Sequence, residues 1–242
     1  MIKVWEGHNG SHIDDLAGHR DRVSCLAFRR ATTQLFSGSA DRTVKVWNVE
    51  ARAFIETLHG HQSEVLGIDC LDKERAVSSG ADGTCRVWKI AEESQLVFKP
   101  RPAASIDCLS LVNESSFVTG SQDGSFDLWM SAKKSPMDVH RSAHGDSWVS
   151  AVSSCKRSDL AASGGHNGVI QLWSITLRGT AQAEPVTGIN PINAPGFVNG
   201  LAFSKDGKVL IAGLGQEHRL GRWGKDKQAQ NGVLIVPLQY NN

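Results

Sequence analysis

The sequence has almost no excess of charge of either sign. Its 26 basic and 25 acidic side chains leave a formal net charge of +1 over 242 residues. Bulk charge therefore predicts nothing about nucleic acid, and any RNA site has to be a local patch. Long apolar runs are also missing, since none approaches the roughly 20 residues that cross a bilayer. We expect no membrane partner, and the strand-like start at Ile2–Trp5 does not have the shape of a signal peptide.

Residues that form redox, metal or cofactor sites are sparse and badly spaced. The five cysteines show no CxxC pair and no even count, which favours reduced packing residues in cytosol or nucleus. The nine histidines show neither HExxH nor a mixed cysteine–histidine ligand spacing, so we expect no metal. Gly213-Leu214-Gly215 leads from one predicted strand into another, whereas a dinucleotide loop opens a helix. We predict no cofactor and no small-molecule substrate.

What the sequence does contain is a repeat, which is clearest in residues 18–49, GHRDRVSCLAFRRATTQLFSGSADRTVKVWNV. Three short apolar runs are separated there by turn signals. In the third run, β-branched residues alternate with other side chains, and period-two alternation predicts a strand. Gly18-His19 precedes the first run and Trp47-Asn48 closes the third. This is the pattern of a WD repeat, with Asn in place of Asp.

Tryptophan marks the same position in successive repeats. Six of the seven tryptophans follow one another at steps of 42, 41, 41, 44 and 50 residues. A period of about 40–45 residues with four strands per unit is typical of a β-propeller. The six are Trp5, Trp47, Trp88, Trp129, Trp173 and Trp223. The seventh, Trp148, is expected on a different strand.

These repeats predict an all-β WD-repeat β-propeller with five complete four-stranded blades in residues 18–242. Residues 1–17 are expected to form a partial blade that consists of a third and a fourth strand only. In blade five, the run HRLGRW is expected to be the third strand and VLIVPL the fourth. A propeller closes when one terminus completes the blade begun by the other. Because the two ends do not complement each other here, we expect a fragment of a longer, seven-bladed propeller.

Serine, histidine and aspartate occur together in the first repeat, as they do in hydrolases. We interpret them as structural, because a WD repeat joins its loop His, turn Asp, strand Ser and strand Trp in one buried hydrogen-bonded set. A nucleophile would need an accessible oxygen and an oxyanion hole. The expected set is His19, Ser39, Asp41 and Trp47 in blade one, His61, Asp82 and Trp88 in blade two, and Asp123 and Trp129 in blade three. Gly80 stands at the expected serine position of blade two, so only blade one is expected to be complete. We predict that the chain is not an enzyme.

Basic residues are more frequent in the loops of one predicted propeller face. That face carries the first-to-second and third-to-fourth strand loops, which include Arg29 and Arg30. Basic loops bind phosphates, although solvated turn residues give the same pattern. The opposite face is nearly balanced, with Arg20, Arg22, Arg42 and Arg219 against Asp21, Asp41, Asp82 and Glu217.

Two segments are not generic to WD repeats. They are EESQLVF at residues 92–98 and GQEHRLGRW at residues 215–223. Together with GHRDRVSCLAFRR and DRTVKVWNV, they resemble the WD-repeat proteins of the U3 small nucleolar ribonucleoprotein over essentially the whole chain. The basic N-terminal extension and first blades of that family have no counterpart among these residues. On the family-like segments we nominate Arg29, Arg30, Arg219 and Arg222 as RNA-binding candidates.

The resemblance implies a seven-bladed, non-catalytic subunit of the nucleus and nucleolus. Its expected partners are U3 small nucleolar RNA (snoRNA), the box C/D core and proteins of the small-subunit processome. The implied role is pre-rRNA processing toward 18S rRNA and the small ribosomal subunit. The alternative is a generic WD-repeat scaffold or a substrate adaptor of a ubiquitin ligase. RNA affinity that falls steeply with salt would separate the two readings.

Overall fold

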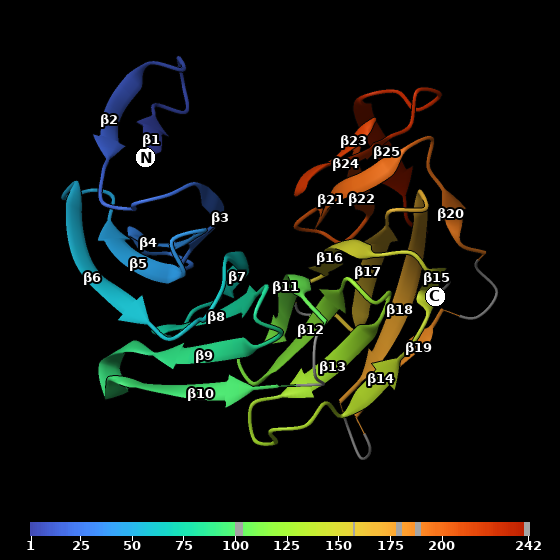
Figure 1. Ribbon diagram of the computed structural model, residues 1–242, viewed down its shortest axis with the longest axis horizontal. Coiled ribbons are helices and arrows are strands. Elements are labelled where there is room, and N and C mark those ends of the chain that lie inside the picture. Colours follow the sequence, from blue (N-terminus) through green and yellow to red (C-terminus); the bar gives the residue numbers. More distant parts are fainter. Residues whose placement is uncertain (100–103, 157, 178–180, 187–189, 240–242) are drawn as a thin grey trace. The chain divides into compact units, whose positions relative to one another are not determined.

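The fold is almost entirely β-strand in the computed structural model, which describes residues 1–99, 104–156, 158–177, 181–186 and 190–239 (Figure 1). For Arg222 and Trp223 the structure describes the backbone only. The chain divides into two compact units, residues 1–103 and residues 104–242. No helix within the described ranges is long and apolar enough to span a membrane.

Unit 1 contains a hairpin and two four-stranded antiparallel sheets. The hairpin pairs β1 (Ile2–Trp5) with β2 (His12–Leu16), which places the two predicted strands of the partial blade side by side. Blade one is β3 (Val23–Phe28), β4 (Gln34–Ser39), β5 (Thr43–Asn48) and β6 (Ala53–His59). Blade two is β7 (Val65–Cys70), β8 (Arg75–Gly80), β9 (Cys85–Lys89) and β10 (Ser94–Phe98), with the 3₁₀ turn η1 (Ile90–Glu92) before its last strand.

The described residues of unit 2 form three further blade sheets and one two-stranded hairpin. Blade three is β11 (Ile106–Asn113), β12 (Ser116–Ser121), β13 (Phe126–Met130) and β14 (Asp138–His140). After the short β15 (Ala143–Asp146), blade four is β16 (Val149–Ser154), β17 (Leu160–Gly165), β18 (Val169–Thr176) and β19 (Gln182–Pro185), and β20 (Ile192–Asn193) also pairs with β18. Blade five is β21 (Phe197–Phe203), β22 (Val209–Gly215) and β25 (Gly232–Pro237).

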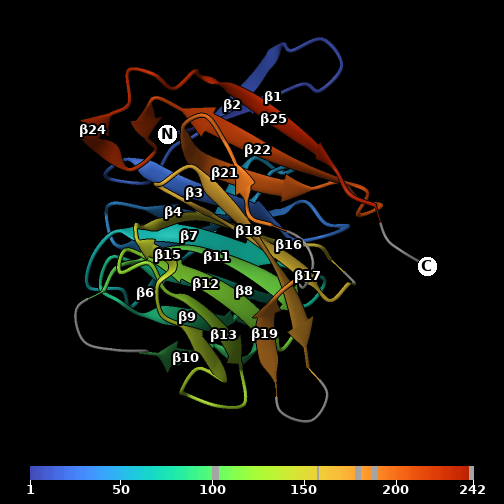
Figure 2. The ribbon, with the colours of Figure 1, turned by 90° about the vertical axis from the view of Figure 1, so that its right-hand side faces the viewer.

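Blade five corrects the sequence-based expectation of five complete four-stranded blades. Among the described residues its sheet has three strands, and β25 pairs directly with β22. The segment with Trp223 forms a separate hairpin, β23 (Glu217–His218) with β24 (Gly221–Lys225). Figure 2 shows β21, β22 and β25 side by side, with β24 at one end of them. The step of 50 residues to Trp223 therefore reflects an inserted hairpin and not another copy of the third strand.

Close contact between neighbouring sheets depends on a glycine in the second strand. A Cβ on Gly38 would lie 2.6 Å from Val65 Cγ1, one on Gly120 2.4 Å from Val149 Cγ1, and one on Gly164 2.3 Å from Val198 Cγ1. In each case the valine belongs to the first strand of the following blade. The missing side chain thus lets the inner strands of consecutive blades pack closely.

The cysteines contribute to this packing. All five are free, Cys70, Cys85, Cys108 and Cys155 are buried, and Cys25 is half-buried. Cys25 and Cys108 lie on first strands, as expected. Burial raises the pKa of the Cys108 thiol to about 12, so it stays protonated and inert. The cysteines therefore behave as small apolar residues.

Candidate nucleic-acid interface

The buried polar sets of blades one and two are complete and have the same geometry. In blade one, the Trp47 indole donates to Ser37 Oγ at 2.8 Å, and Ser37 Oγ lies 2.7 Å from His19 Nε2. His19 Nδ1 lies 2.8 Å from Asp41 Oδ2. In blade two the corresponding distances along Trp88, Ser78, His61 and Asp82 are 2.8, 2.8 and 3.0 Å.

The structure replaces the expected serine by the one two positions earlier. Ser39 Oγ instead accepts the main-chain N–H of Asp41 at 3.1 Å and donates to the carbonyl of Asp21. Ser37 and Ser39 lie on the same side of β4, so the alternation of the strand does not distinguish them. The same shift places Ser78 in the set of blade two, which is complete despite Gly80.

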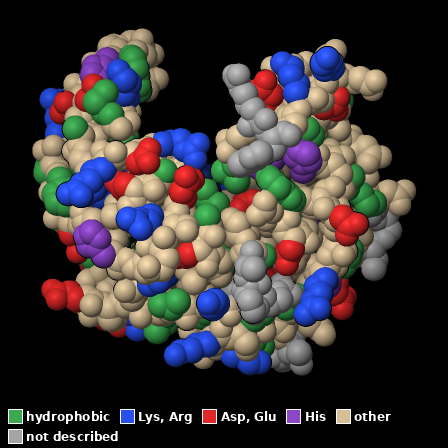
Figure 3. Space-filling view, in the orientation of Figure 1, with side chains coloured by type: hydrophobic (Ala, Val, Ile, Leu, Met, Phe, Trp, Pro, Cys, Tyr) green, Lys and Arg blue, Asp and Glu red, His purple; other side chains and the backbone are tan. Residues whose placement is uncertain are grey.

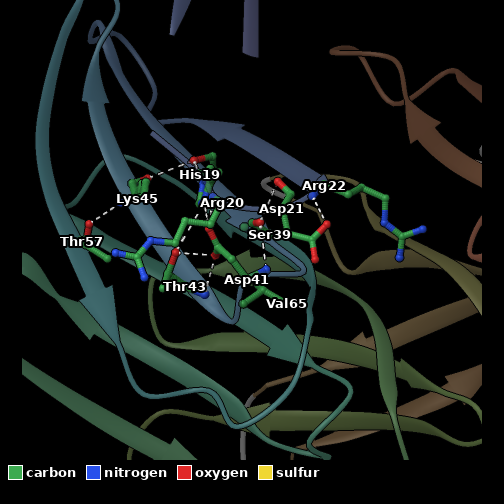
Figure 4. A network of polar contacts seen from close by, with 12 residues as sticks. His19, Arg20, Asp21, Arg22, Ser39, Asp41, Thr43, Lys45, Thr57 and Val65 are labelled. Atoms are coloured by element: carbon green, nitrogen blue, oxygen red, sulfur yellow. Dashed lines mark hydrogen bonds and ion pairs between the residues drawn. The ribbon is translucent and has the colours of Figure 1, made fainter. Parts of the chain in front are cut away.

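The protonation states of His19 and Asp41 fix the direction of the hydrogen bonds in the blade-one set. Burial lowers the pKa of His19, which favours a neutral ring that donates Nδ1–H to Asp41 and accepts from Ser37. Burial acts to raise the pKa of Asp41, but hydrogen bonds from Thr43, the Arg20 main chain and His19 hold it well below its usual range. Figure 4 shows this network around Asp41, and the carboxylate is ionised within it.

The sets of the next two blades are incomplete. In blade three, Trp129 donates to Thr119 Oγ1 at 3.0 Å, while Asp123 accepts from the Ser125 hydroxyl at 2.6 Å and no described histidine takes part. In blade four, Trp173 donates to Ser163, and Ser163 lies 2.7 Å from His144 Nε2.

The fourth member is missing in blade four, because Asn167 stands where the other blades have Asp. Its amide donates to the His144 carbonyl, and His144 Nδ1 is buried without a hydrogen-bond partner among the described residues. Burial accordingly lowers the pKa of His144 to about 4.

These sets cannot perform hydrolysis, although their order matches a catalytic triad. The Ser37 side chain is fully buried, and the His19 and Asp41 side chains are 1% and 8% exposed. A substrate could not reach the serine oxygen without opening the blade, and the oxygen already accepts from an indole. The complete sets therefore hold the turns of blades one and two in place.

Of the four nominated arginines, Arg29 and Arg30 are held by their own unit. Arg29 Nε donates to the Asp72 carbonyl at 2.9 Å, and its guanidinium lies 3.8 Å from the Glu74 carboxylate. The Arg30 main-chain N–H donates to the Leu71 carbonyl at 3.1 Å. Both residues thus help to join blade one to the β7–β8 turn.

Arg219 spans three blades of unit 2. It leaves the β23–β24 hairpin, and its guanidinium donates to the carbonyls of Ser150 in β16 and Asp107 in β11. Burial raises the pKa of the Asp107 carboxyl to about 6, against the opposing effect of the Arg219 charge. Arg219 therefore ties the inner strands together. Arg222 lies in β24, and its side chain is outside the described residues.

No group of three or more His, Cys, Asp or Glu that could hold a metal occurs in the part of the chain that the structure describes. The surface view in Figure 3 shows basic and acidic side chains interspersed, in keeping with the small net charge. A local cluster of cations, rather than a broad basic face, is what could attract a polyanion.

Comparisons with known proteins agree with this architecture. The family model "WD domain, G-beta repeat" matches residues 10–48, 52–89 and 137–174. The solved structures "Structure of U3-55K" and "Crystal structure of RRP9 WD40 repeats" superpose with a TM-score of 0.93 at 46% identity, cover 98% of this chain, and are covered over 74% and 73% of their own length.

The chain belongs to the U3-55K family of WD-repeat proteins.

Curated relatives of the U3-55K family match over almost all of this chain. "U3 small nucleolar RNA-interacting protein 2" of Homo sapiens is 46% identical over 99% of the chain, and "U3 snoRNP-associated protein-like EMB2271" of Arabidopsis thaliana is 42% identical over 98%. "Ribosomal RNA-processing protein 9" of Saccharomyces cerevisiae is 27% identical over 97%. The chain spans about half the length of these relatives, 51%, 52% and 54%.

The two segments that resembled the U3-55K family at the sequence level lie outside the repeated core of the blades. Residues 92–98 run from the end of η1 through β10, the outermost strand of blade two. Residues 215–223 form most of the inserted hairpin that carries Arg219. Their departure from the WD pattern is what made them recognisable. The sequence did not predict the hairpin, because Trp223 lies at a spacing close to that of the repeat.

Proposed function

We propose that this chain is a non-catalytic subunit of the U3 small nucleolar ribonucleoprotein. It binds U3 snoRNA together with proteins of the box C/D core and the small-subunit processome. In this role it serves pre-rRNA processing toward 18S rRNA and the small ribosomal subunit, in the nucleolus. The observation that carries the proposal is the 46% identity over 99% of the chain to a protein named for its interaction with U3 small nucleolar RNA.

Two structural features support a binding role without catalysis. The serine–histidine–aspartate sets found in the described residues are buried and repeat in two blades with closely similar distances, as expected for a scaffold. The blades also present loops and hairpins whose polar side chains are open to partners, such as the exposed Arg20 and Arg42. Rigid scaffolds with functional loops are the usual arrangement in binding proteins.

The test is recovery of RNA with the tagged protein from cells after cross-linking, followed by sequencing. We expect enrichment of U3 snoRNA over other small nucleolar RNAs. Purified protein should bind U3 RNA more tightly than an unrelated RNA of equal length, with affinity that falls steeply as salt rises. Recovery of peptide partners with no enriched RNA would favour the generic scaffold instead.

A further inference from the structure

A groove of about 500 Å³ opens on unit 1 where blade one meets the segment that leads into blade two. Its walls come from the loop before β3, the β4–β5 turn, β5, β6 and the loop after β6. Arg20, Arg42 and His59 are exposed around it, and Lys45 is half-buried. We call it the blade-one groove. Asp41 and Gly60 also line it.

The positive charges of the groove are not neutralised by carboxylates. Arg20, Arg42 and Lys45 form no ion pair within the described residues. Lys45 Nζ donates to Thr57 Oγ1 at 2.6 Å and lies 4.8 Å from the centre of the Phe54 ring. The three side chains therefore keep donors for a ligand.

The one acidic residue in the lining already has its hydrogen bonds. Asp41 Oδ2 takes His19 Nδ1 and the Arg20 main-chain N–H at 2.8 and 2.9 Å. Asp41 Oδ1 takes the main-chain N–H and the hydroxyl of Thr43 at 3.0 and 2.6 Å. An anion that enters the groove thus meets three cations against one carboxylate whose oxygens face inward.

A fourth cation lies directly beneath the groove. Arg86 occupies in β9 the place that Lys45 has in β5, and it is only 9% exposed. Its Nη1 donates to Gln95 Oε1 at 2.7 Å, whereas its Nε is buried with no hydrogen-bond partner. A Cβ on Gly60, which lines the groove, would lie 2.5 Å from Arg86 Nη1. Glycine at this position lets the groove floor approach the buried guanidinium.

We propose that the blade-one groove binds the phosphodiester backbone of RNA. The inference rests on the proposed function and names the part of the molecule that contacts the phosphates. The lining offers cationic and hydroxyl donors but no Phe, Tyr or Trp on which a base could stack, so it fits backbone contact without base readout. Arg29 and Arg219 are fastened to their own units, whereas Arg20 and Arg42 are free of ion pairs and exposed.

The test compares two variants in RNA binding measured by fluorescence anisotropy over a series of salt concentrations. The groove variant carries Arg20→Gln and Arg42→Asn, because Arg42 has a φ of +70°, which asparagine tolerates. The matched control is Arg22→Gln, because Arg22 is an exposed neighbour whose guanidinium lies 2.9 Å from Glu64. Figure 4 shows Arg20 and Arg22 extending to opposite sides of the network. Circular dichroism and thermal melts establish that both variants fold.

We expect the groove variant to bind U3 RNA more weakly and to lower the slope of log K against log salt by about 2, close to one for each lost phosphate contact. The control variant should keep the slope of the parent. A parent protein that binds RNA together with an unchanged slope in the groove variant overturns this inference and leaves the proposed function standing. A parent protein that binds no RNA overturns both the inference and the proposed function.

Discussion

At the scale of single residues, one small hydroxyl in blades one, two and four joins the tryptophan of the third strand to the loop before the first. Ser37, Ser78 and Ser163 lie within hydrogen-bond distance of both an indole and an imidazole, while Thr119 has the indole alone. Each hydroxyl is fully buried. Removing it leaves two buried polar groups without a partner in the serine blades, which is costlier than the loss of the bond itself.

We therefore expect Ser37→Ala to lower the free energy of unfolding by ~1–3 kcal/mol. Ser39→Ala should cost less, because its two partners are the main-chain N–H of the half-buried Asp41 and the carbonyl of the exposed Asp21. Urea unfolding of both variants measures the difference. His19→Ala should resemble Ser37→Ala, since it opens the same chain of hydrogen bonds. Equal losses for the two serine variants would contradict the assignment of Ser37.

The missing carboxylate of blade four predicts a response to acid. The pKa of His144 is about 4 in the folded protein and 6.5 in the unfolded chain. As pH falls, the unfolded chain therefore binds the proton first. This histidine withdraws stability as pH falls from about 6.5 to about 4. The raised pKa of Asp107, about 6, acts in the opposite direction over part of that window.

Asn167→Asp should complete the set in blade four. The new carboxylate accepts from His144 Nδ1, as Asp41 does from His19, and we expect a gain of ~1 kcal/mol at pH 7. The pKa of His144 rises with the charge beside it, so less stability is lost between pH 6.5 and pH 4. Thermal melts across that range compare the variant with the parent. A parallel pH profile for the two proteins would contradict the expected contact.

At the scale of elements, the second strand of a blade is shaped by its neighbour. Gly164 in β17 faces Val198 in β21, and the Ser150 hydroxyl of β16 donates to the Val198 carbonyl at 2.6 Å and lies 3.2 Å from the Gly164 carbonyl. Ser24 bonds the carbonyls of Gly38 and Val65 in the same way in unit 1. A first-strand serine and a second-strand glycine thus hold the next inner strand in place.

Gly164→Ala should destabilise the protein by ~1–3 kcal/mol, because its Cβ would meet Val198 Cγ1 at 2.3 Å. Adding Val198→Ala should recover part of the loss, so that the double variant costs less than the sum of the single ones. Gly232→Ala in β25 is the control, since nothing lies within 4 Å of its Cβ position. Urea unfolding of all four variants tests the coupling. Strict additivity would show that the contact relaxes without strain.

At the scale of the whole molecule, each unit leaves an apolar strand surface open to water. In unit 1, Leu26 and Phe28 on β3 are 50% and 57% exposed. In unit 2, Ile211, Val233 and Ile235 on β22 and β25 are 39%, 67% and 64% exposed. Exposed apolar patches of this kind favour association. We therefore expect the isolated protein to self-associate through such a surface.

The double substitution Leu26→Ser and Phe28→Ser should reduce self-association of the isolated protein. Because these side chains are half exposed, the melting temperature should change far less than after Leu35→Ser, whose side chain is 2% exposed. Light scattering at increasing concentration and a thermal melt measure the two effects. Unchanged scattering would mean that this surface does not drive association.

The sequence predicts a large part of this structure for a physical reason. Period-two alternation and the tryptophan interval depend on local geometry, so the first three strands of blades one to four appear where expected. Choosing between Ser37 and Ser39 requires the register between β4 and β5, which alternation does not contain. The hairpin around Trp223 required knowing that β22 pairs with β25, a contact between distant residues.

The candidate interface was less predictable than the fold. The sequence suggested that Arg29 and Arg219 could contact RNA. In the structure, their guanidinium groups donate to main-chain carbonyls of residues distant in the sequence. In the sequence, Asp41 balanced a basic residue on this face, so the groove was not predicted. The hydrogen bonds that occupy Asp41 depend on the tertiary structure. Arg86 gave no signal, since its burial follows from the loop that covers it.

The three-stranded sheet of blade five has a consequence for molecular recognition. Its last strand, β25, pairs with β22 on one side, and no described strand pairs with the other. Half of its main-chain amides and carbonyls can therefore receive an extended peptide as an added strand. Pro237 has no N–H, so the ladder of such an added strand would end at that residue.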